Sequence, residues 1–169
     1  GRRSTEQVSD PVHTDVLVLG CGIAGGTAAL ELAEAGLDVV IVTRADRAEE
    51  SNTYWAQGGI IFRGEGDSPG LLAKDIEHAG DGLCHSEAVR LLAESGPPLV
   101  QSILLDRLKV PFDRRPDGQL ALGREGGHSL PRILHATDAT GRAIEDALVA
   151  ALRAHPRVRF LTSHTAVDL

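Results

Sequence analysis

The chain has 169 residues, of which 42% are hydrophobic and 24% are charged, and its formal net charge is −7. This length and composition suit one globular domain with its own core. The acidic balance argues against a nucleic-acid partner, and no stretch approaches the roughly 20 apolar residues that a membrane span needs.

The first residues differ in composition from the rest of the chain. Residues 1–11 (GRRSTEQVSDP) are polar and aperiodic, so we expect a disordered leader, with the N-terminal part of a folded domain at residues 12–169. The chain contains no Met and opens with Gly1, which predicts a fragment or a processed form.

A strand, a helix and a second strand follow one another. Residues 15–19 (DVLVL) predict a short buried strand, residues 24–35 a helix that Gly36 ends, and residues 38–43 (DVVIVT) a parallel return strand. This order predicts an α/β, Rossmann-like domain built on a βαβ unit.

A GxGxxG pattern lies between the first strand and the helix. Gly20 permits the tight turn, Gly22 lets the backbone approach a pyrophosphate, and Gly25 lets the helix pack closely on the strand. A diphosphate would then lie at the helix N-terminus. The alternative is a glycine-rich turn without a ligand, which the flanking strands disfavour. The residues assigned to the cofactor here are Gly20, Cys21, Gly22, Ile23, Ala24 and Gly25.

The second strand lacks the acid that commonly binds the ribose of NAD. It ends in Thr43 and Arg44, and Asp46 lies too far past the strand for that role, which weakens a simple NAD interpretation. Arg44 could contact the adenosine or the diphosphate of a cofactor. A solvated arginine is the alternative.

The remainder of the chain predicts mixed α/β structure. Helices are expected at residues 67–79, 86–108 and 140–154, and a strand at residues 158–161. Ser86 suits a helix start, and we expect Pro97 and Pro98 to divide the second of these helices into two.

The second motif is SNTYWAQGG, residues 51–59. Its two final glycines allow backbone to lie close to a planar ring, its polar side chains offer partners for a flavin edge or a phosphate, and it holds the chain's only Trp and only Tyr. A surface loop rich in turn residues is the alternative. The residues assigned to cofactor binding are Asn52, Thr53, Tyr54, Trp55, Ala56, Gln57, Gly58 and Gly59.

The third motif is REGGHS, residues 124–129. Gly126 and Gly127 permit close approach of the backbone to a ligand, and their amides, with His128 and Ser129, could bind a substrate carboxylate.

Three segments carry a resemblance to a known family: DVLVLGCGIAGGTAALELAEAG, SNTYWAQGGI and REGGHSLPRILHATDATGRAIEDAL. Together and in this order they resemble the N-terminal part of the L-aspartate oxidases, in the succinate dehydrogenase and fumarate reductase flavoprotein superfamily. The resemblance implies an incomplete FAD-binding domain, without the capping and C-terminal domains. It also implies oxidation of L-aspartate to iminoaspartate with oxygen or fumarate as acceptor, the first step of de novo NAD biosynthesis, with quinolinate synthase downstream. We expect the isolated chain to be inactive.

The resemblance also implies roles for two residues. The succinate dehydrogenase loop resembles SHTVSAQGG, whose histidine bonds covalently to the flavin; Asn52 matches that position, so FAD should be held noncovalently. Glu125 is the predicted catalytic and substrate-binding residue, because its carboxylate can pair with the α-ammonium group that succinate lacks. The alternative is a solvated glutamate paired with Arg124.

No metal site is predicted. His128, Arg132 and His135 lie close in sequence, but Pro131 breaks a helix there and neither a cysteine nor an acid completes a ligand set. Arg132 and His135 are assigned to supporting the substrate or flavin pocket, with a purely structural His135 as the alternative.

The two cysteines are too few for a disulfide framework and fit a reducing cytoplasm. Cys21 occupies the phosphate turn, where a small side chain is needed. Cys84 is expected to be buried filler between helices.

Two other functions stay open. One is a fumarate reductase or succinate dehydrogenase flavoprotein subunit, which Asn52 and Glu125 disfavour. The other is a noncatalytic nucleotide-binding module that uses the Gly20 turn alone.

Overall fold

The computed structural model describes residues 11–137 and 139–168. The leader predicted at residues 1–11 therefore falls almost wholly outside the described residues. Two three-stranded sheets are present in the described part. The first is parallel and the second antiparallel.

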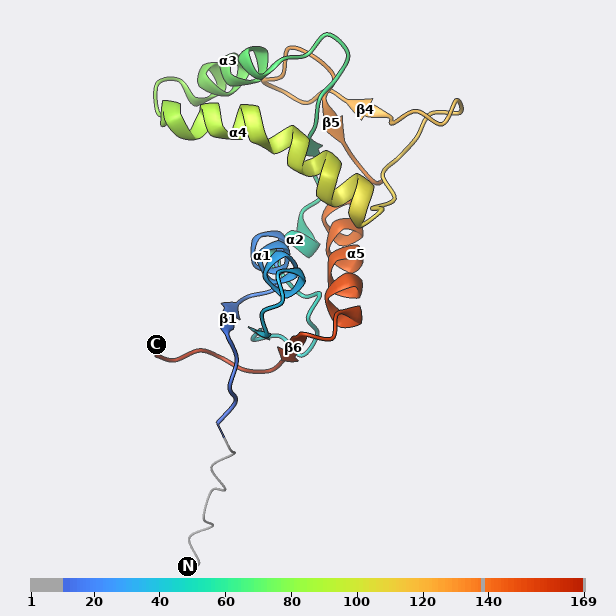
Figure 1. Ribbon diagram of the computed structural model, residues 1–169. Helices are drawn as coiled ribbons and strands as arrows, with labels where there is room; N and C mark the ends of the chain where they lie inside the picture. Colours follow the sequence, from blue (N-terminus) through green and yellow to red (C-terminus); the bar gives the residue numbers. More distant parts are fainter. Residues whose placement is uncertain (1–10, 138, 169) are drawn as a thin grey trace, which may run out of the picture.

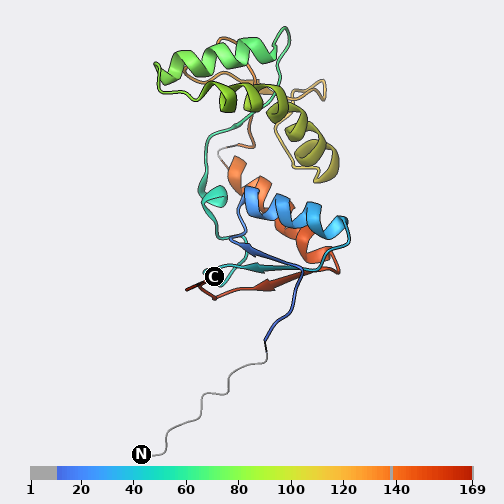
Figure 2. The same cartoon turned by 60° about the vertical axis from the view of Figure 1, so that its left-hand side comes forward.

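The parallel sheet and two helices form one half of the molecule. Its strands are β1 (Val16–Leu19), β2 (Val39–Val42) and β6 (Val158–Leu161), and β2 lies between the other two. The helices α1 (Ile23–Glu34) and α5 (Thr140–Ala154) cover one face of this sheet (Figure 2). The predicted Rossmann-like βαβ unit is confirmed.

A tight core lies between these helices and the sheet. Ala29, Ile41, Leu148 and Leu152 are all buried there. A Cβ atom at Gly26 would lie 2.6 Å from Leu148 Cδ2, so α1 and α5 cross at a point where only glycine fits. The helix predicted at residues 140–154 contributes Leu148 and Leu152 to this core from α5.

The other half of the molecule holds the antiparallel sheet and the longer remaining helices (Figure 1). Its elements are β3 (Ile60–Ile61), α3 (Pro69–Gly80), α4 (Ser86–Leu99), the π-helix η1 (Val100–Arg107), β4 (Leu122–Gly123) and β5 (Ile133–Leu134), and β5 lies between β3 and β4. Here α3 packs against α4, and a second core of Leu104, Phe112, Leu134 and Ile144 connects this half to α5. The short helix α2 (Asn52–Trp55) belongs with the first half, where it packs against α5.

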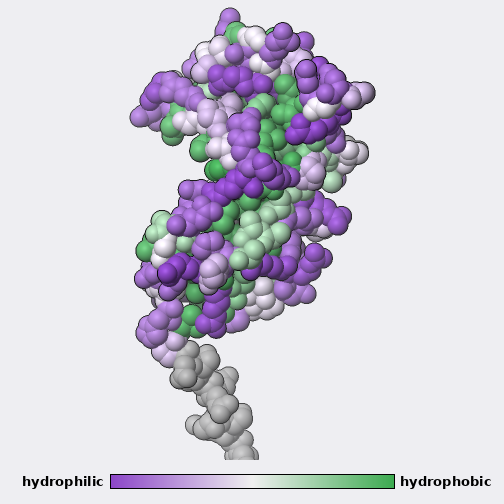
Figure 3. All heavy atoms as spheres, turned by 45° about the vertical axis from the view of Figure 1, so that its right-hand side comes forward, coloured by the Kyte–Doolittle hydropathy of each residue, from purple (hydrophilic) through white to green (hydrophobic). Residues whose placement is uncertain are grey.

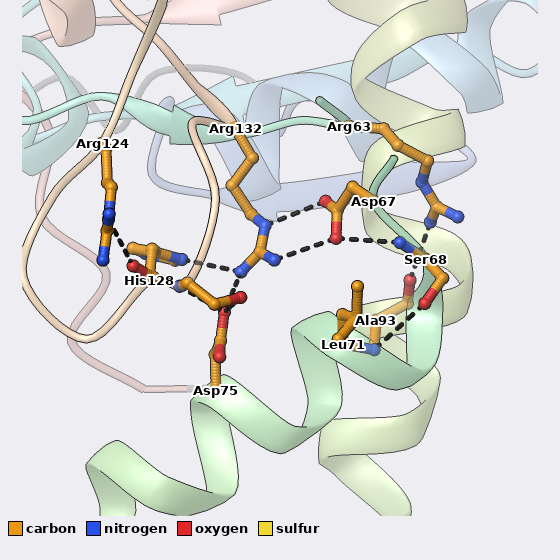
Figure 4. Close-up of polar contacts among 10 residues, drawn as sticks. Arg63, Asp67, Ser68, Leu71, Asp75, Ala93, Arg124, His128 and Arg132 are labelled. Carbon is orange, nitrogen blue, oxygen red and sulfur yellow. Dashed lines mark hydrogen bonds and ion pairs between the residues drawn. The ribbon is translucent and has the colours of Figure 1, made fainter. Parts of the chain in front are cut away.

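The helix predicted at residues 86–108 is divided in type after Pro97 and Pro98, as expected, but it is not interrupted. The helix α4 passes both prolines and continues directly as η1, with Val100 still in the right-handed helical region. Proline has no N–H, so Pro97 cannot donate to the carbonyl of Ala93. Arg63 Nη2 donates to that carbonyl instead, at 3.2 Å (Figure 4). An external donor therefore replaces the helical bond that Pro97 cannot make.

Some apolar residues are exposed among polar ones. On the face shown in Figure 3, several of them lie where the two halves of the molecule meet. On β1, Leu17 and Leu19 are about half exposed, at 48% and 47%. Within the described residues, no helix combines the length and apolarity that crossing a membrane requires.

Candidate cofactor and substrate site

The glycine turn after β1 has the geometry that the motif predicts. Gly20 has a φ of +94°, in the region that favours glycine, and its N–H donates to Val42 O at 2.8 Å. A Cβ atom at Gly25 would lie 2.2 Å from the carbonyl oxygen of Gly20 and 3.2 Å from Val18 Cγ1. The helix thus approaches the strand closely, as predicted.

The N-terminus of α1 meets the second motif. Gly22 is the N-cap residue and makes no side-chain cap bond, while the N–H of Ile23 donates to Thr53 Oγ1 at 3.0 Å. A Cβ atom at Gly22 would lie 3.1 Å from the same hydroxyl. The first two motifs, about 30 residues apart in sequence, therefore build one site.

A cavity of about 560 Å³ lies at the carboxyl ends of the three parallel strands. This edge of an open α/β sheet is where ligands bind. Seven of the predicted cofactor residues line it: Gly20, Cys21, Gly22, Arg44, Asn52, Thr53 and Trp55. A diphosphate and its attached groups suit such a space, because the N-terminus of α1 and glycine backbone face it.

Sequence reasoning missed the residues that follow β6. His164, Thr165 and Ala166 also line the cavity, and the N–H of His164 donates to Thr43 O at 3.1 Å. Because parallel strands end at the same edge, residues after the predicted strand at 158–161 could have been included on that ground.

The other predicted cofactor residues lie elsewhere. Ile23 and Ala24 line a separate apolar groove of about 420 Å³ beside η1, Ala56 accepts from the N–H of Gly141 at 2.9 Å, and Gln57 is exposed. Tyr54 packs edge-on against Trp55, with ring centroids 5.1 Å apart.

The two glycines of the second motif differ in their surroundings. A Cβ atom at Gly59 would lie 2.0 Å from Ile133 Cγ2 and 2.5 Å from Leu134 O, whereas one at Gly58 would meet only Glu125 Oε1, at 4.0 Å. The close packing on β5 therefore requires glycine at residue 59, and the approach of its backbone to a planar ring stays a prediction. Gly58, by contrast, has free space where a side chain would lie.

Glu125 lies beside the second motif. Its Oε1 accepts from the N–H of Gly59 at 3.4 Å, and its side chain is exposed. The alternative pairing with Arg124 is not what the structure gives, since Arg124 Nε donates to the carbonyl of His128 at 2.8 Å. The second and third motifs are therefore adjacent in space.

His128 and Ser129 are engaged with protein groups. Ser129 donates to Asp75 Oδ2 through both its N–H and its Oγ, each at 2.8 Å, and His128 Nδ1 lies 3.1 Å from Arg132 Nη1. Their assignment to substrate binding stays a prediction, which these contacts do not support. The described residues include no group of three or more His, Cys, Asp or Glu placed to hold a metal.

His135 pairs with Asp113. The distance from His135 Nδ1 to Asp113 Oδ2 is 3.1 Å, and the N–H of Thr137 donates to the same oxygen at 2.9 Å. The bond from Thr137, with a smaller contribution from His135, lowers the pKa of Asp113. This arrangement favours the structural alternative for His135.

A buried carboxyl lies near the glycine turn. Glu145 on α5 has 0% exposed surface, and neither carboxyl oxygen has a hydrogen-bond partner among the described residues. Burial raises its pKa to about 7. The Ser51 hydroxyl, which is near the carboxyl but outside hydrogen-bond geometry, lowers that pKa in part, and the charge of Glu49 raises it. Burial, and then the charge of Glu145, raises the pKa of the Cys21 thiol to about 12.

Both cysteines are free thiols. The prediction for Cys84 needs correction, because that side chain is half-buried, and its Sγ donates to Ile76 O at 3.5 Å.

Comparisons with known proteins agree with this geometry. Residues 15–169 match the model of a family described as FAD binding domain. An L-aspartate oxidase of Streptomyces coelicolor is 48% identical over 145 residues, covering 85% of this chain and 24% of that protein. One of Halobacterium salinarum is 43% identical over 162 residues, covering 96% and 31%.

Solved structures give the same fold. A structure of E. coli quinol fumarate reductase has a TM-score of 0.84 and 26% identity, covering 92% of this chain and 26% of that one. The Mycobacterium smegmatis Sdh1 complex has a TM-score of 0.80 and 29% identity, covering 89% and 27%. The chain thus spans about a quarter to a third of its curated relatives' length, 24% and 31% in these two.

Proposed function

Because this chain belongs to the FAD binding domain family and its cofactor is FAD, we propose that it forms the cofactor-binding part of an L-aspartate oxidase. The activity proposed is that of a protein of the relatives' full length, of which this chain corresponds to about a quarter. The reaction would oxidise L-aspartate to iminoaspartate, with oxygen or fumarate as electron acceptor. It removes a hydride from Cα and a proton from the nitrogen.

The residues around the cavity suit FAD. The turn at Gly20 and Gly22 and the N-terminus of α1 would hold the diphosphate, and Arg44 would contact the adenosine end. Residues 52–59 would lie toward the flavin ring, and the cofactor would supply a hydride acceptor there.

Asn52 supports noncovalent attachment, because an amide cannot form a histidyl bond to the flavin. It lies at the start of α2 and lines the cavity. Acid precipitation of a protein that extends this chain to the full length of its relatives should release all FAD into the supernatant. Flavin that stays with the pellet would contradict this proposal.

The contact between Gly59 and Glu125 is the observation that supports L-aspartate as the substrate. It puts a carboxylate beside the segment proposed to face the flavin. A carboxylate can accept charge-assisted hydrogen bonds from an α-ammonium group. It would thereby orient the adjacent Cα–H bond toward the flavin. Succinate and fumarate offer no such group, so Glu125 would distinguish amino acids from plain dicarboxylates.

The test is substrate choice in the chain extended to the length of its relatives. Glu125→Gln should reduce kcat/KM for L-aspartate by roughly tenfold or more, the order expected for one hydrogen bond to a charged group, and affect fumarate reduction far less. Glu77→Gln, which changes an exposed glutamate on α3 in the same way, is the matched control. Equal losses with both substrates would remove Glu125 from amino-group recognition.

A fumarate reductase or succinate dehydrogenase subunit is the second candidate. The similarity in fold to quinol fumarate reductase favours it, whereas Asn52 and Glu125 favour the oxidase. The third candidate, a noncatalytic nucleotide-binding module, requires that substitutions in residues 51–59 leave the affinity for FAD unchanged.

The compartment and partners are also part of the proposal. Two free thiols are typical of a reducing compartment, which supports a cytoplasmic protein. L-aspartate would be the small-molecule substrate, and quinolinate synthase the enzyme that uses the product.

A further inference from the structure

A buried ion-pair cluster, formed by Arg132, Asp67 and Asp75, lies between the third motif and α3 (Figure 4). Arg132 has 0% exposed surface. Its Nε donates to Asp67 Oδ2 and its Nη2 to Asp67 Oδ1, each at 2.9 Å, and its Nη1 donates to Asp75 Oδ2 at 2.5 Å. Burial alone would lower the pKa of Arg132, but the two carboxylates leave it raised. The two carboxylates thus favour the charged form of the Arg132 guanidinium.

Asp75 extends the cluster to the motif itself. The oxygen that accepts from Arg132 also accepts from the N–H and the Oγ of Ser129, each at 2.8 Å. The bond from the Ser129 backbone, and then the bond and charge of Arg132, lower the pKa of Asp75 to about 2. One carboxylate oxygen on α3 therefore holds the end of the 124–129 loop.

The loop is held in shape between that anchor and Glu125. Arg124 Nε donates to His128 O at 2.8 Å, and the N–H of His128 donates to Glu125 O at 3.2 Å. Gly127 takes a φ of +84°, which allows the chain to turn between them. A displacement at Ser129 would consequently be transmitted to Glu125, which meets Gly59 at the other end of the loop.

A buried ion-pair cluster is a costly way to gain stability. Removing charges from water is unfavourable for each ion, and apolar packing of the same volume often stabilises a fold equally well. The bidentate pair between Arg132 and Asp67 and the branched acceptor at Asp75 do, however, fix distances and directions. The value of the cluster lies in the geometry that it imposes on the loop.

We propose that Asp75 is a positioning residue that, together with Arg132, fixes the 124–129 loop so that Glu125 meets the amino group of the substrate. This inference rests on the proposed function and adds to it a specificity device outside the site. Asp75 does not touch the substrate. It acts through Ser129 and the loop.

The test compares two substrates in the holoenzyme of full family length. Asp75→Asn should lower kcat/KM for L-aspartate about tenfold, mostly through a higher KM, because it weakens a charge-assisted anchor. Fumarate reduction by chemically reduced enzyme should change by less than about twofold, because that substrate does not use Glu125. Asp106→Asn, the same change at an exposed residue on η1, is the matched control and should leave both activities unchanged.

The coupling to Glu125 gives the decisive readout. In a Glu125→Gln background, Asp75→Asn should have little further effect on L-aspartate, because no carboxylate is left to position. An equal loss with both substrates, or a full tenfold loss in that background, would overturn the inference. If Asp75→Asn yields no holoenzyme, Ser129→Ala decides. It should show the same selectivity on a smaller scale, and a loss without selectivity would overturn the inference.

The proposed function can fail separately. If Glu125→Gln itself shows no selectivity for L-aspartate, the role of Glu125 is wrong and the inference falls with it. If Glu125→Gln is selective and Asp75→Asn is not, only the positioning role is refuted.

Discussion

Glu145 should make the stability of the fold depend on pH. Its carboxyl is fully buried without a hydrogen-bond partner among the described residues, and burial raises its pKa from an ordinary value of 4.5 to about 7. Below pH 4.5 both the folded and the unfolded chain hold the proton, so the carboxyl does not lower the free energy of unfolding. Between pH 4.5 and 7 only the folded chain holds it, and stability falls as the pH rises.

The size of the effect follows from the two pKa values. One pKa unit corresponds to about 1.4 kcal/mol, so a rise from 4.5 to about 7 costs roughly 3 kcal/mol of unfolding free energy above pH 7. Glu145→Gln keeps the shape of the side chain and removes the charge. The variant should therefore gain roughly 3 kcal/mol over the unmodified protein between pH 4.5 and pH 8.

Denaturant unfolding followed by circular dichroism across this pH range measures the difference. Glu94→Gln is the matched control, since Glu94 forms an exposed pair with Arg90 on α4, and such pairs contribute less than about 1 kcal/mol. Its difference from the unmodified protein should stay nearly flat with pH. If Glu145→Gln gives an equally flat difference, the carboxylate is ionised in the folded protein and the reasoning is wrong.

Two further predictions concern packing and reactivity. Gly59→Ala should cost about 1–3 kcal/mol of unfolding free energy, because its Cβ would overlap Ile133. Gly58→Ala should leave stability nearly unchanged. Thermal melts of the two variants in the opposite order of stability would contradict the packing argument. Cys84 should react with a thiol reagent at pH 8 well before Cys21, whose burial raises its pKa to about 12, and faster labelling of Cys21 in the folded protein would show that the turn opens.

Much of the first half of the fold could be predicted from the sequence, because its signals are local. The glycine spacing and the apolar runs at residues 15–19 and 38–43 determine a strand, a turn and a helix without help from distant residues. The helix through Pro97 could not be predicted in this way. Its continuation depends on Arg63, which lies 30 residues away along the chain and reaches the free carbonyl of Ala93.

The parts of the site that carry a sequence motif could be predicted. The parts that depend only on how distant strands pair could not. The meeting of Glu125 with Gly59 depends on β5 pairing with both β3 and β4, and no local pattern specifies that pairing. Glu145 did carry a signal, since Leu148 and Val149 follow it at helical spacing and place it on the apolar stripe. An acid on such a stripe is a candidate for a buried, neutral carboxyl.

The most direct test of the proposed oxidase is anaerobic bleaching of the flavin absorbance at full family length. Adding L-aspartate should bleach the bound FAD, and Glu125→Gln should require a much higher concentration for the same effect. Flavin that L-aspartate leaves unchanged, but that fumarate reoxidises after chemical reduction, would contradict the oxidase and assign the chain to a fumarate reductase.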